Sequence, residues 1–512
     1  MTSRFRFPAC SARLLALGAA SLLGAVSAWA QTDGPAPVAS PPPPPASLAV
    51  ARLTLDEAIA RALRHNQRIK VSEYGRGIAR ANVLAEYGRF DPALTFRRFY
   101  SESELALSPT SSVSAVSQSD EYGAGLEGLL PFGTQYQLGG SSQNQRGTYN
   151  NFSNRFVTFG GLSVTQPLLR GFGFGANLAS LRIAKADRTI SDWEYRQAVI
   201  DTVTSVVLAY NDLAEARENL RIAHRSRDLA AKLVSDNERR NRVGSLSDAD
   251  VTQARARVAN REEFILIARR NIKNVENRLR TLIGAGEVSP NPPDLAIEPL
   301  ARAPAMSGDG VTDLQRALAL RPDYQAARQG LVKGRANRSF AVNQMLPRVD
   351  FVGSYGYNGI DPSFAASREQ VRNRDNRAYT AGVVVSVPLT FAQGRGRYRA
   401  AKLGLLQAEA DVVRLEQDIA VTVANAIGQL ETAAERVQAT TRAYELAQQA
   451  LDAEEKRFRA GTSSTFLVLQ LQEQLAAVES GQVRAIADQH RAQANYQREI
   501  GATLEARQLT VE

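Results

Sequence analysis

The chain has 512 residues, of which 44% are hydrophobic and 22% charged, and its formal net charge at pH 7 is +10; this is the composition of a folded protein. Aromatic residues make up only 7%, fewer than a compact core of this length usually holds. Segments 175–285 and 395–505 are instead dominated by Ala, Gln, Arg, Leu and Glu, which favours long packed helices. The positive charge does not indicate a nucleic-acid partner, because no motif of interleaved basic and aromatic residues accompanies it.

Residues 1–30 have the pattern of a secretory signal peptide. A basic segment precedes the apolar run Leu14–Val26 and the cleavage site Ala28-Trp29-Ala30. The run is shorter than the ~18 residues that span a bilayer. The single cysteine, Cys10, lies in this segment, so the mature protein is expected to contain no disulfide and no cysteine metal site.

Residues 31–51 are expected to form an extended linker, because they include the proline run Pro41–Pro45. Beyond the linker, no apolar run is long enough for a transmembrane helix. An exported protein of this kind is periplasmic, extracellular or inserted as a β-barrel.

The rest of the chain is an internal duplication. Residues 55–96 align without gaps with 310–351, so that Arg80-Ala81-Asn82 matches Arg335-Ala336-Asn337 and Pro92 matches Pro347. We therefore divide the chain into a first repeat (52–300), a second repeat (301–505) and a C-terminal tail (506–512).

Both repeats have the same order of expected elements. Each begins with a helix of about 35 residues and a β-region, and continues with a very long helix and a shorter returning helix. In the first repeat these elements are 54–88, 92–170, 175–240 and 247–283; in the second they are 311–345, 349–390, 396–458 and 464–500.

The expected strands alternate apolar and polar residues. Tyr355 and Tyr357 point to one face and Ser354 and Gly356 to the other. Strands of about ten residues with one apolar face and aromatic ends are typical of a transmembrane barrel, although an ordinary soluble sheet is the alternative. Strand-to-helix turns are expected at Pro167, Gly171, Gly173, Pro388 and Gly394.

Each long helix ends at a short turn that starts a hairpin tip. A glycine suits the residue after a helix, and a serine can cap the next helix. The two tips are Gly244, Ser245, Leu246 and Ser247, and Gly461, Thr462, Ser463 and Ser464.

The signal peptide, the duplicated halves and the paired glycine tips resemble the TolC-like outer-membrane factor family, the outer membrane efflux proteins. The resemblance rests on Gln166-Pro167-Leu168, Val387-Pro388-Leu389 and the tip patterns that begin at Arg240 and Arg457. It implies an α+β fold in which about four strands per subunit join a barrel shared by a homotrimer, continuous with a long periplasmic coiled-coil barrel. It also implies contact with outer-membrane lipid and, through the tips, with a periplasmic adaptor protein and an inner-membrane pump. The first β-region is longer than this scheme requires, so the sequence leaves open whether it contains an extra hairpin.

The resemblance also implies a gate near the tips. Asp250 matches an acidic gating position, whereas Leu467 and Gln470 occupy places where some members carry charged residues. A constriction here is therefore expected to rely on apolar contact or amide hydrogen bonds. The alternative for Asp250 is a solvated carboxylate at a helix start. The stretch Arg368–Arg377 is expected to be a solvated outer loop or a contact for lipopolysaccharide.

No reactive cluster is found, and neither a catalytic residue nor a cofactor nor a metal is expected. His65, His224 and His490 lack metal-ligand spacing, and Gly171–Gly175 lacks the full dinucleotide-binding spacing. We interpret the chain as the subunit of an exit duct for efflux or type I secretion. A periplasmic coiled-coil scaffold or adhesin without a pore, and an exported enzyme, are the alternatives; the cargo stays open.

Overall fold

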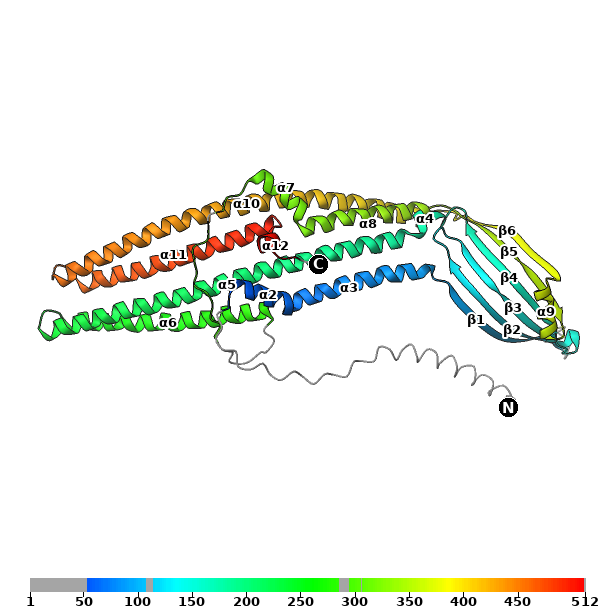
Figure 1. The fold of residues 1–512 in the computed structure, drawn as a ribbon, viewed down its shortest axis with the longest axis horizontal. Helices are drawn as coiled ribbons and strands as arrows, with labels where there is room; N and C mark the ends of the chain where they lie inside the picture. The colour runs from blue at the N-terminus through cyan, green and yellow to red at the C-terminus, as the bar shows by residue number, and fades with distance from the viewer. Residues whose placement is uncertain (1–52, 107–113, 285–293, 305, 511–512) are drawn as a thin grey trace, which may run out of the picture. The chain divides into compact units, whose positions relative to one another are not determined.

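The structure is a computed structural model that describes residues 53–106, 114–284, 294–304 and 306–510 (Figure 1). These residues belong to one compact unit that starts at Arg52. The expected signal peptide, the proline-rich linker and Cys10 lie outside the described residues.

The helix expected at the start of each repeat is two helices, which corrects the prediction of one continuous helix. In the first repeat, α2 (Leu55–His65) ends at Asn66, whose side chain accepts hydrogen bonds from the backbone of the next helix, α3 (Gln67–Tyr87). In the second repeat, α7 (Gly310–Leu320) ends at Arg321, and Pro322 starts α8 (Pro322–Gln344). Asparagine caps a new helix and proline starts one, so both residues favour a break.

Two long helices dominate the unit: α5 (Ala179–Arg242) with 64 residues and α10 (Ala392–Arg459) with 68. At 1.5 Å per residue each is about 100 Å long. The returning helices α6 (Asp248–Ile283) and α11 (Thr465–Glu499) lie beside α5 and α10 respectively (Figure 1). The short helices α4 (Gly173–Asn177) and α12 (Thr503–Ala506) flank them.

The helices have a consistent lateral order. Nearer the sheet, α3 packs on α5, α5 on α8 and α8 on α10. Nearer the tips, α6 packs on α5, α5 on α11 and α11 on α10. Helices α3 and α6 therefore form one edge of the unit and α10 forms the other.

Within the described residues, six antiparallel strands form a single sheet in chain order, which corrects the expectation of about four. The first repeat contributes four strands and the second two: β1 (Ala93–Ala106), β2 (Ser114–Leu129), β3 (Gln135–Gly147), β4 (Phe156–Pro167), β5 (Arg348–Asp361) and β6 (Asn376–Ser386). The additional hairpin is β2–β3, closed by a turn in which the amide N–H of Leu130 donates to the carbonyl of Thr134 at 2.8 Å. The one-turn helices Gly88–Phe90 and Thr148–Asn150 precede β1 and β4.

A helix, α9 (Phe364–Asn373), joins β5 to β6. This corrects the expectation of an outer loop within Arg368–Arg377. Helix α9 packs against β4 and β5. It lies at the end of the sheet opposite the helices, because β5 begins just after α8 and β6 ends just before α10.

Three buried clusters hold the helices together. The first centres on Ile200, Val203 and Leu213 of α5, and the second on Ile419 and Leu430 of α10. The third, near the tips, joins Leu233 of α5 to residues of α10 and α11: Leu451, Phe458, Val468, Leu469 and Leu475. Burying each such side chain contributes about 1.5–3 kcal/mol. The first cluster also includes Ala494 and Leu504 of the second repeat, so the first and third clusters both link the repeats.

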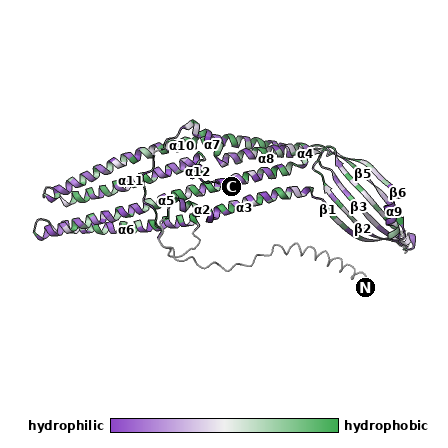
Figure 2. Cartoon of the chain, viewed as in Figure 1, coloured by the Kyte–Doolittle hydropathy of each residue, from purple (hydrophilic) through white to green (hydrophobic). Residues whose placement is uncertain are grey.

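Hydrophilic and hydrophobic residues are interspersed along the helices (Figure 2). Within the described part of the chain, no helix has the length and apolar character needed to cross a membrane.

Candidate functional site

The two hairpin tips have nearly the same capped geometry. Gly244 and Gly461 adopt positive φ angles of 74° and 79°, which glycine reaches without a steric penalty. A Cβ atom on either glycine would meet no heavy atom within 4 Å. Ser247 and Ser464 cap the helices that follow. Both tips therefore expose small residues around a defined turn.

The three gate candidates do not meet within the subunit. Asp250 accepts a hydrogen bond of 2.5 Å from the hydroxyl of Ser247, as part of the cap of α6. Leu467 and Gln470 are exposed one turn apart at the start of α11. Among the described residues, no hydrogen bond or ion pair joins Asp250 to either of them.

A contact between the hairpins lies just above the tips, and the sequence patterns did not reveal it. The Arg240 guanidinium lies 4.3 Å from the ring centroid of Phe458 and donates to the carbonyl of Arg459 at 3.5 Å. Fully buried Asn237 donates to the hydroxyl of Thr465 at 3.4 Å. Arg240 belongs to the tip pattern, but the pattern does not show which residue on the other hairpin it contacts.

Ion pairs join the repeats further along the helices. Arg491 of α11 donates to Asp212 of α5 at 2.7 and 2.9 Å and also bonds Glu215. Burial alone would lower the pKa of Arg491, but the hydrogen bonds and charges of these carboxylates outweigh it and raise the pKa. Arg221 and Arg225 of α5 both contact Glu479 of α11 at 3.2 Å. The hairpins are thus tied together over several helical turns.

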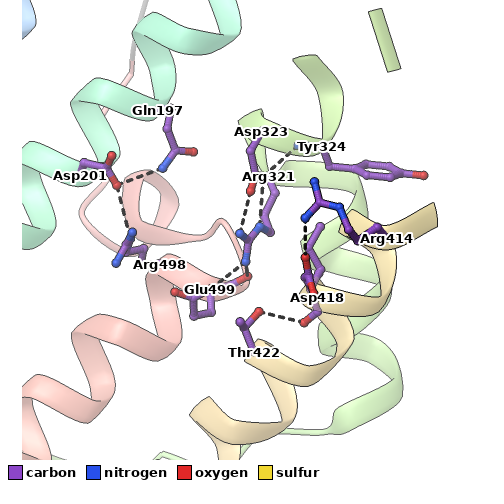
Figure 3. A network of polar contacts seen from close by, with 11 residues as sticks. Gln197, Asp201, Arg321, Asp323, Tyr324, Arg414, Asp418, Thr422, Arg498 and Glu499 are labelled. Carbon is purple, nitrogen blue, oxygen red and sulfur yellow. Dashed lines mark hydrogen bonds and ion pairs between the residues drawn. The ribbon is translucent and has the colours of Figure 1, made fainter. Parts of the chain in front are cut away.

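A further network fixes the break between α7 and α8 (Figure 3). Arg321 donates two hydrogen bonds to Asp323, at 3.1 and 2.7 Å, and one to the Glu499 carboxylate of α11 at 2.7 Å. The neighbouring Arg498 pairs with Asp201 of α5 at 3.3 Å. Burial alone would raise the pKa of Asp323, but Arg321 outweighs it and lowers the pKa. The break is therefore held from α11 and linked through it to the first repeat.

The strand-to-helix turns of the two repeats differ. In the first repeat, Pro167 ends β4, and Gly171 and Gly173 adopt φ angles of 86°. The Gly171 amide donates to the Asn343 side chain at 2.7 Å, and the Gly173 amide donates to the carbonyl of Phe132 in the β2–β3 turn at 2.9 Å.

In the second repeat, Pro388 follows β6, but Gly394 lies inside α10, so its assignment as a turn residue was wrong. Phe391 instead adopts the left-handed conformation, with φ 52°. A Cβ atom on Gly394 would lie 3.1 Å from Met345 Cα, so this glycine permits close packing against the end of α8.

The two faces of the sheet differ sharply in polarity. One face, the apolar face, carries a cross-strand row of four leucines and two tyrosines: Leu94, Leu126, Leu138, Leu162, Tyr355 and Tyr379. All six are exposed, from 37% for Leu126 to 71% for Tyr379. The adjacent row on the opposite, polar face is Glu127, Gln137, Ser163, Ser354 and Thr380. The predicted alternation is confirmed, and the apolar face needs an apolar environment.

Glycines make the sheet curve toward the polar face. Gly125, Gly139, Gly161 and Gly356 are direct partners across four successive strands. A Cβ atom on Gly139 would lie 2.5 Å from Gly125 Cα, and one on Gly161 would lie 2.7 Å from Gly356 Cα. Neighbouring strands approach this closely on one face only where side chains are absent and the sheet bends toward that face.

Both lateral edges of the unit carry unpartnered groups. Within the described residues, β1 and β6 each pair with a strand on one side only. On α3, Val71, Tyr74 and Ile78 are 63–69% exposed and recur at helical spacing on one face. On α10, Leu403, Leu406 and Val413 form an equivalent exposed stripe, which completes a pair of apolar edges.

Comparisons with known proteins agree with this architecture. A family model described as outer membrane efflux protein matches residues 58–285 and 314–502. The pyoverdine export outer membrane protein OpmQ of Pseudomonas putida is 26% identical over 336 residues, which are 64% of this chain and 66% of OpmQ. The protein CyaE of Bordetella pertussis is 30% identical over 267 residues, 50% of this chain and 53% of CyaE. These alignments therefore span just under two thirds and about half of the two relatives.

Solved structures of outer-membrane channels share the fold. The outer-membrane channel OprN superposes with a TM-score of 0.66 at 20% identity, covering 88% of this chain and 90% of OprN. The protein is accordingly located in the outer membrane with a periplasmic extension, and it is not an enzyme. Because the family model covers most of both repeats, the chain belongs to the outer membrane efflux protein family.

Proposed function

We propose that this chain is the subunit of a homotrimeric exit duct for efflux or type I secretion, docked to a periplasmic adaptor and an inner-membrane pump. The observation that carries the proposal is the pair of complementary edges. Each unit has an open strand and an apolar helix stripe on both sides, so identical copies can join edge to edge. Repeated head-to-tail contact closes a ring when the rotation permits it.

In the ring, β1 of one subunit would pair with β6 of the next, and α3 would pack against α10. This removes strand edges that cannot face lipid unpaired. The apolar face would contact outer-membrane lipid. The polar face would line the water-filled interior, which agrees with the direction in which the glycines bend the sheet.

The tips would receive the adaptor. Gly244 and Gly461 leave open space around them, so another helical hairpin can approach the backbone closely. Leu467 and Gln470, together with their copies in the ring, would narrow the entrance by apolar contact and amide hydrogen bonds. Asp250 would act in the gate only after leaving its bond to Ser247, so its primary role is to cap α6.

Edge-to-edge assembly can be tested by cross-linking in outer-membrane fractions. Tyr74 of α3 lies about as far from the sheet as Leu403 of α10, and both are exposed. With Tyr74→Cys and Leu403→Cys in one chain, a bifunctional maleimide should give a covalent trimer. Each single variant is the matched control and should give none. A double variant that stays monomeric in the outer membrane, or a water-soluble monomer in the periplasm, would favour the scaffold alternative.

A further inference from the structure

A groove on the apolar face of the sheet lies beside α9, and we propose that it binds a phosphorylated glycolipid of the outer leaflet. One acyl chain would occupy the groove, and a phosphate would contact Arg368. The inference rests on the proposed function, because it requires the apolar face to contact membrane lipid.

The groove has the shape and polarity of an acyl-chain site. Its volume is about 600 Å³, within the range of small-molecule pockets. The floor consists of small residues on neighbouring strands, Ala124, Gly140 and Gly160. Phe96 and Tyr122 line it from β1 and β2, and Phe364, Arg368 and Val371 line it from α9. An apolar trough on a lipid-facing surface fits a hydrocarbon chain.

Helix α9 is fixed firmly enough to form a permanent wall. Ser367 is fully buried and bonds the hydroxyl of Thr158, which also bonds Ser142 at 2.8 Å. The Gln370 side chain bonds both the amide and the carbonyl of Ile360, at 3.0 and 3.2 Å. The ring of Phe364 packs on Phe156 with centroids 5.8 Å apart. The groove therefore exists before any ligand enters.

The charge beside the groove suits a phosphate. Arg368 and Arg372 lie one turn apart on α9, and neither has a hydrogen-bond or ion-pair partner among the described residues. Like charges at this spacing repel each other on a helix. Arg98, which also lines the groove, is already paired with Asp120 at 3.2 Å. Arg368 thus supplies a guanidinium free to bind phosphate oxygens.

The position of α9 selects the leaflet. It connects the strand ends farthest from the periplasmic helices, so it would lie at the outer leaflet, whose main lipid is lipopolysaccharide. The lipid A part of that molecule carries both phosphates and acyl chains. In the outer leaflet, lipid A is therefore the lipid that supplies both an acyl chain for the groove and a phosphate for Arg368.

The test quantifies lipid A by mass spectrometry in trimers purified from outer membranes. We expect Arg368→Glu, and separately Ala124→Trp, which fills the floor, to reduce bound lipid A at least about tenfold. For Arg368→Glu, loss of one charge-assisted hydrogen bond accounts for a change of this size; for Ala124→Trp, the indole would occupy the space of the acyl chain. The control Arg377→Glu changes an arginine stacked on Tyr379 outside the groove and should retain lipid A.

Unchanged lipid A in both groove variants, or a wild-type trimer that carries mainly phospholipid, would overturn the site. The oligomeric state is measured on the same samples. A wild-type protein that is a monomer in the outer membrane would contradict the proposed function, whereas trimeric variants with wild-type lipid A would contradict only the lipid site.

Discussion

The β2–β3 hairpin predicts a wider barrel than the family resemblance implies. Six strands from each of three subunits give 18, whereas four from each give 12. With strands about 4.8 Å apart and tilted by about 40°, the backbone diameter is about 36 Å for 18 strands and about 24 Å for 12. The extra hairpin would therefore more than double the cross-section of the duct at the outer membrane.

Removing the hairpin is the sharpest perturbation. Deletion of residues 107–147 leaves β1 and β4 antiparallel and joined by 148–155, so a four-stranded sheet can still form. The deletion also removes the contact between Phe132 and the turn at Gly173, so the junction should loosen. Electron cryomicroscopy of trimers in nanodiscs should show about 18 strands in the wild type and about 12 in the deletion variant.

The strand count of the wild-type barrel tests this prediction even if the deletion variant fails to insert. A wild-type barrel of about 24 Å, with β2 and β3 outside the wall, would refute the reasoning. Polymer exclusion from the extracellular side is an independent check, because the wild type should admit larger polymers than the variant.

Three further predictions concern the helices. Gly461→Trp should abolish export while trimers still reach the outer membrane, because the side chain would be strained at positive φ and would occupy the tip. The control is Gly461→Asn, because asparagine tolerates this conformation. Normal export by the Trp variant would contradict the assignment of this tip as the adaptor contact. Arg491→Gln should lower the free energy of unfolding by about 2 kcal/mol, because Asp212 loses its main partner in a partly exposed site. An unchanged melting temperature would show that the ion pair between Arg491 and Asp212 contributes little. The pKa of Asp323 is lowered from 3.8, so the stabilising effect of its carboxylate is complete above pH 3.8 and is lost as the pH falls through the pKa of the folded state. The difference in melting temperature between the wild type and Asp323→Asn should therefore shrink below about pH 4. A difference that stays constant with pH would argue against the ion pair of Asp323 with Arg321.

Local patterns predicted most of the elements. Glycine followed by serine gave both tips, because the left-handed turn and the helix cap need only neighbouring residues. Strand alternation gave the two faces of the sheet for the same reason. The helix breaks at Asn66 and Arg321 are not predicted by the apolar spacing, because this spacing continues across both residues even though Pro322 favours a break.

Contacts between distant segments were not predictable. Arg240 was part of a recognised pattern, yet its packing on Phe458 depends on how the hairpins align. Gly394 was expected in a strand-to-helix turn, but it lies inside α10 because the two repeats end their strands differently.

The sequence by itself determined the duplication, the long helices, the capped tips and the alternating strands, since each follows from periodicity and short-range hydrogen bonding. Only the tertiary structure decided the number of strands in the sheet, the direction of its curvature, the place of α9 and the ion pairs between the repeats. The place of α9 and the ion pairs depend on segments that meet across more than 200 residues, and one chain read alone contains no local signal for such contacts. The length of the first β-region indicated room for an extra hairpin, but only the pairing of the strands placed it in the sheet.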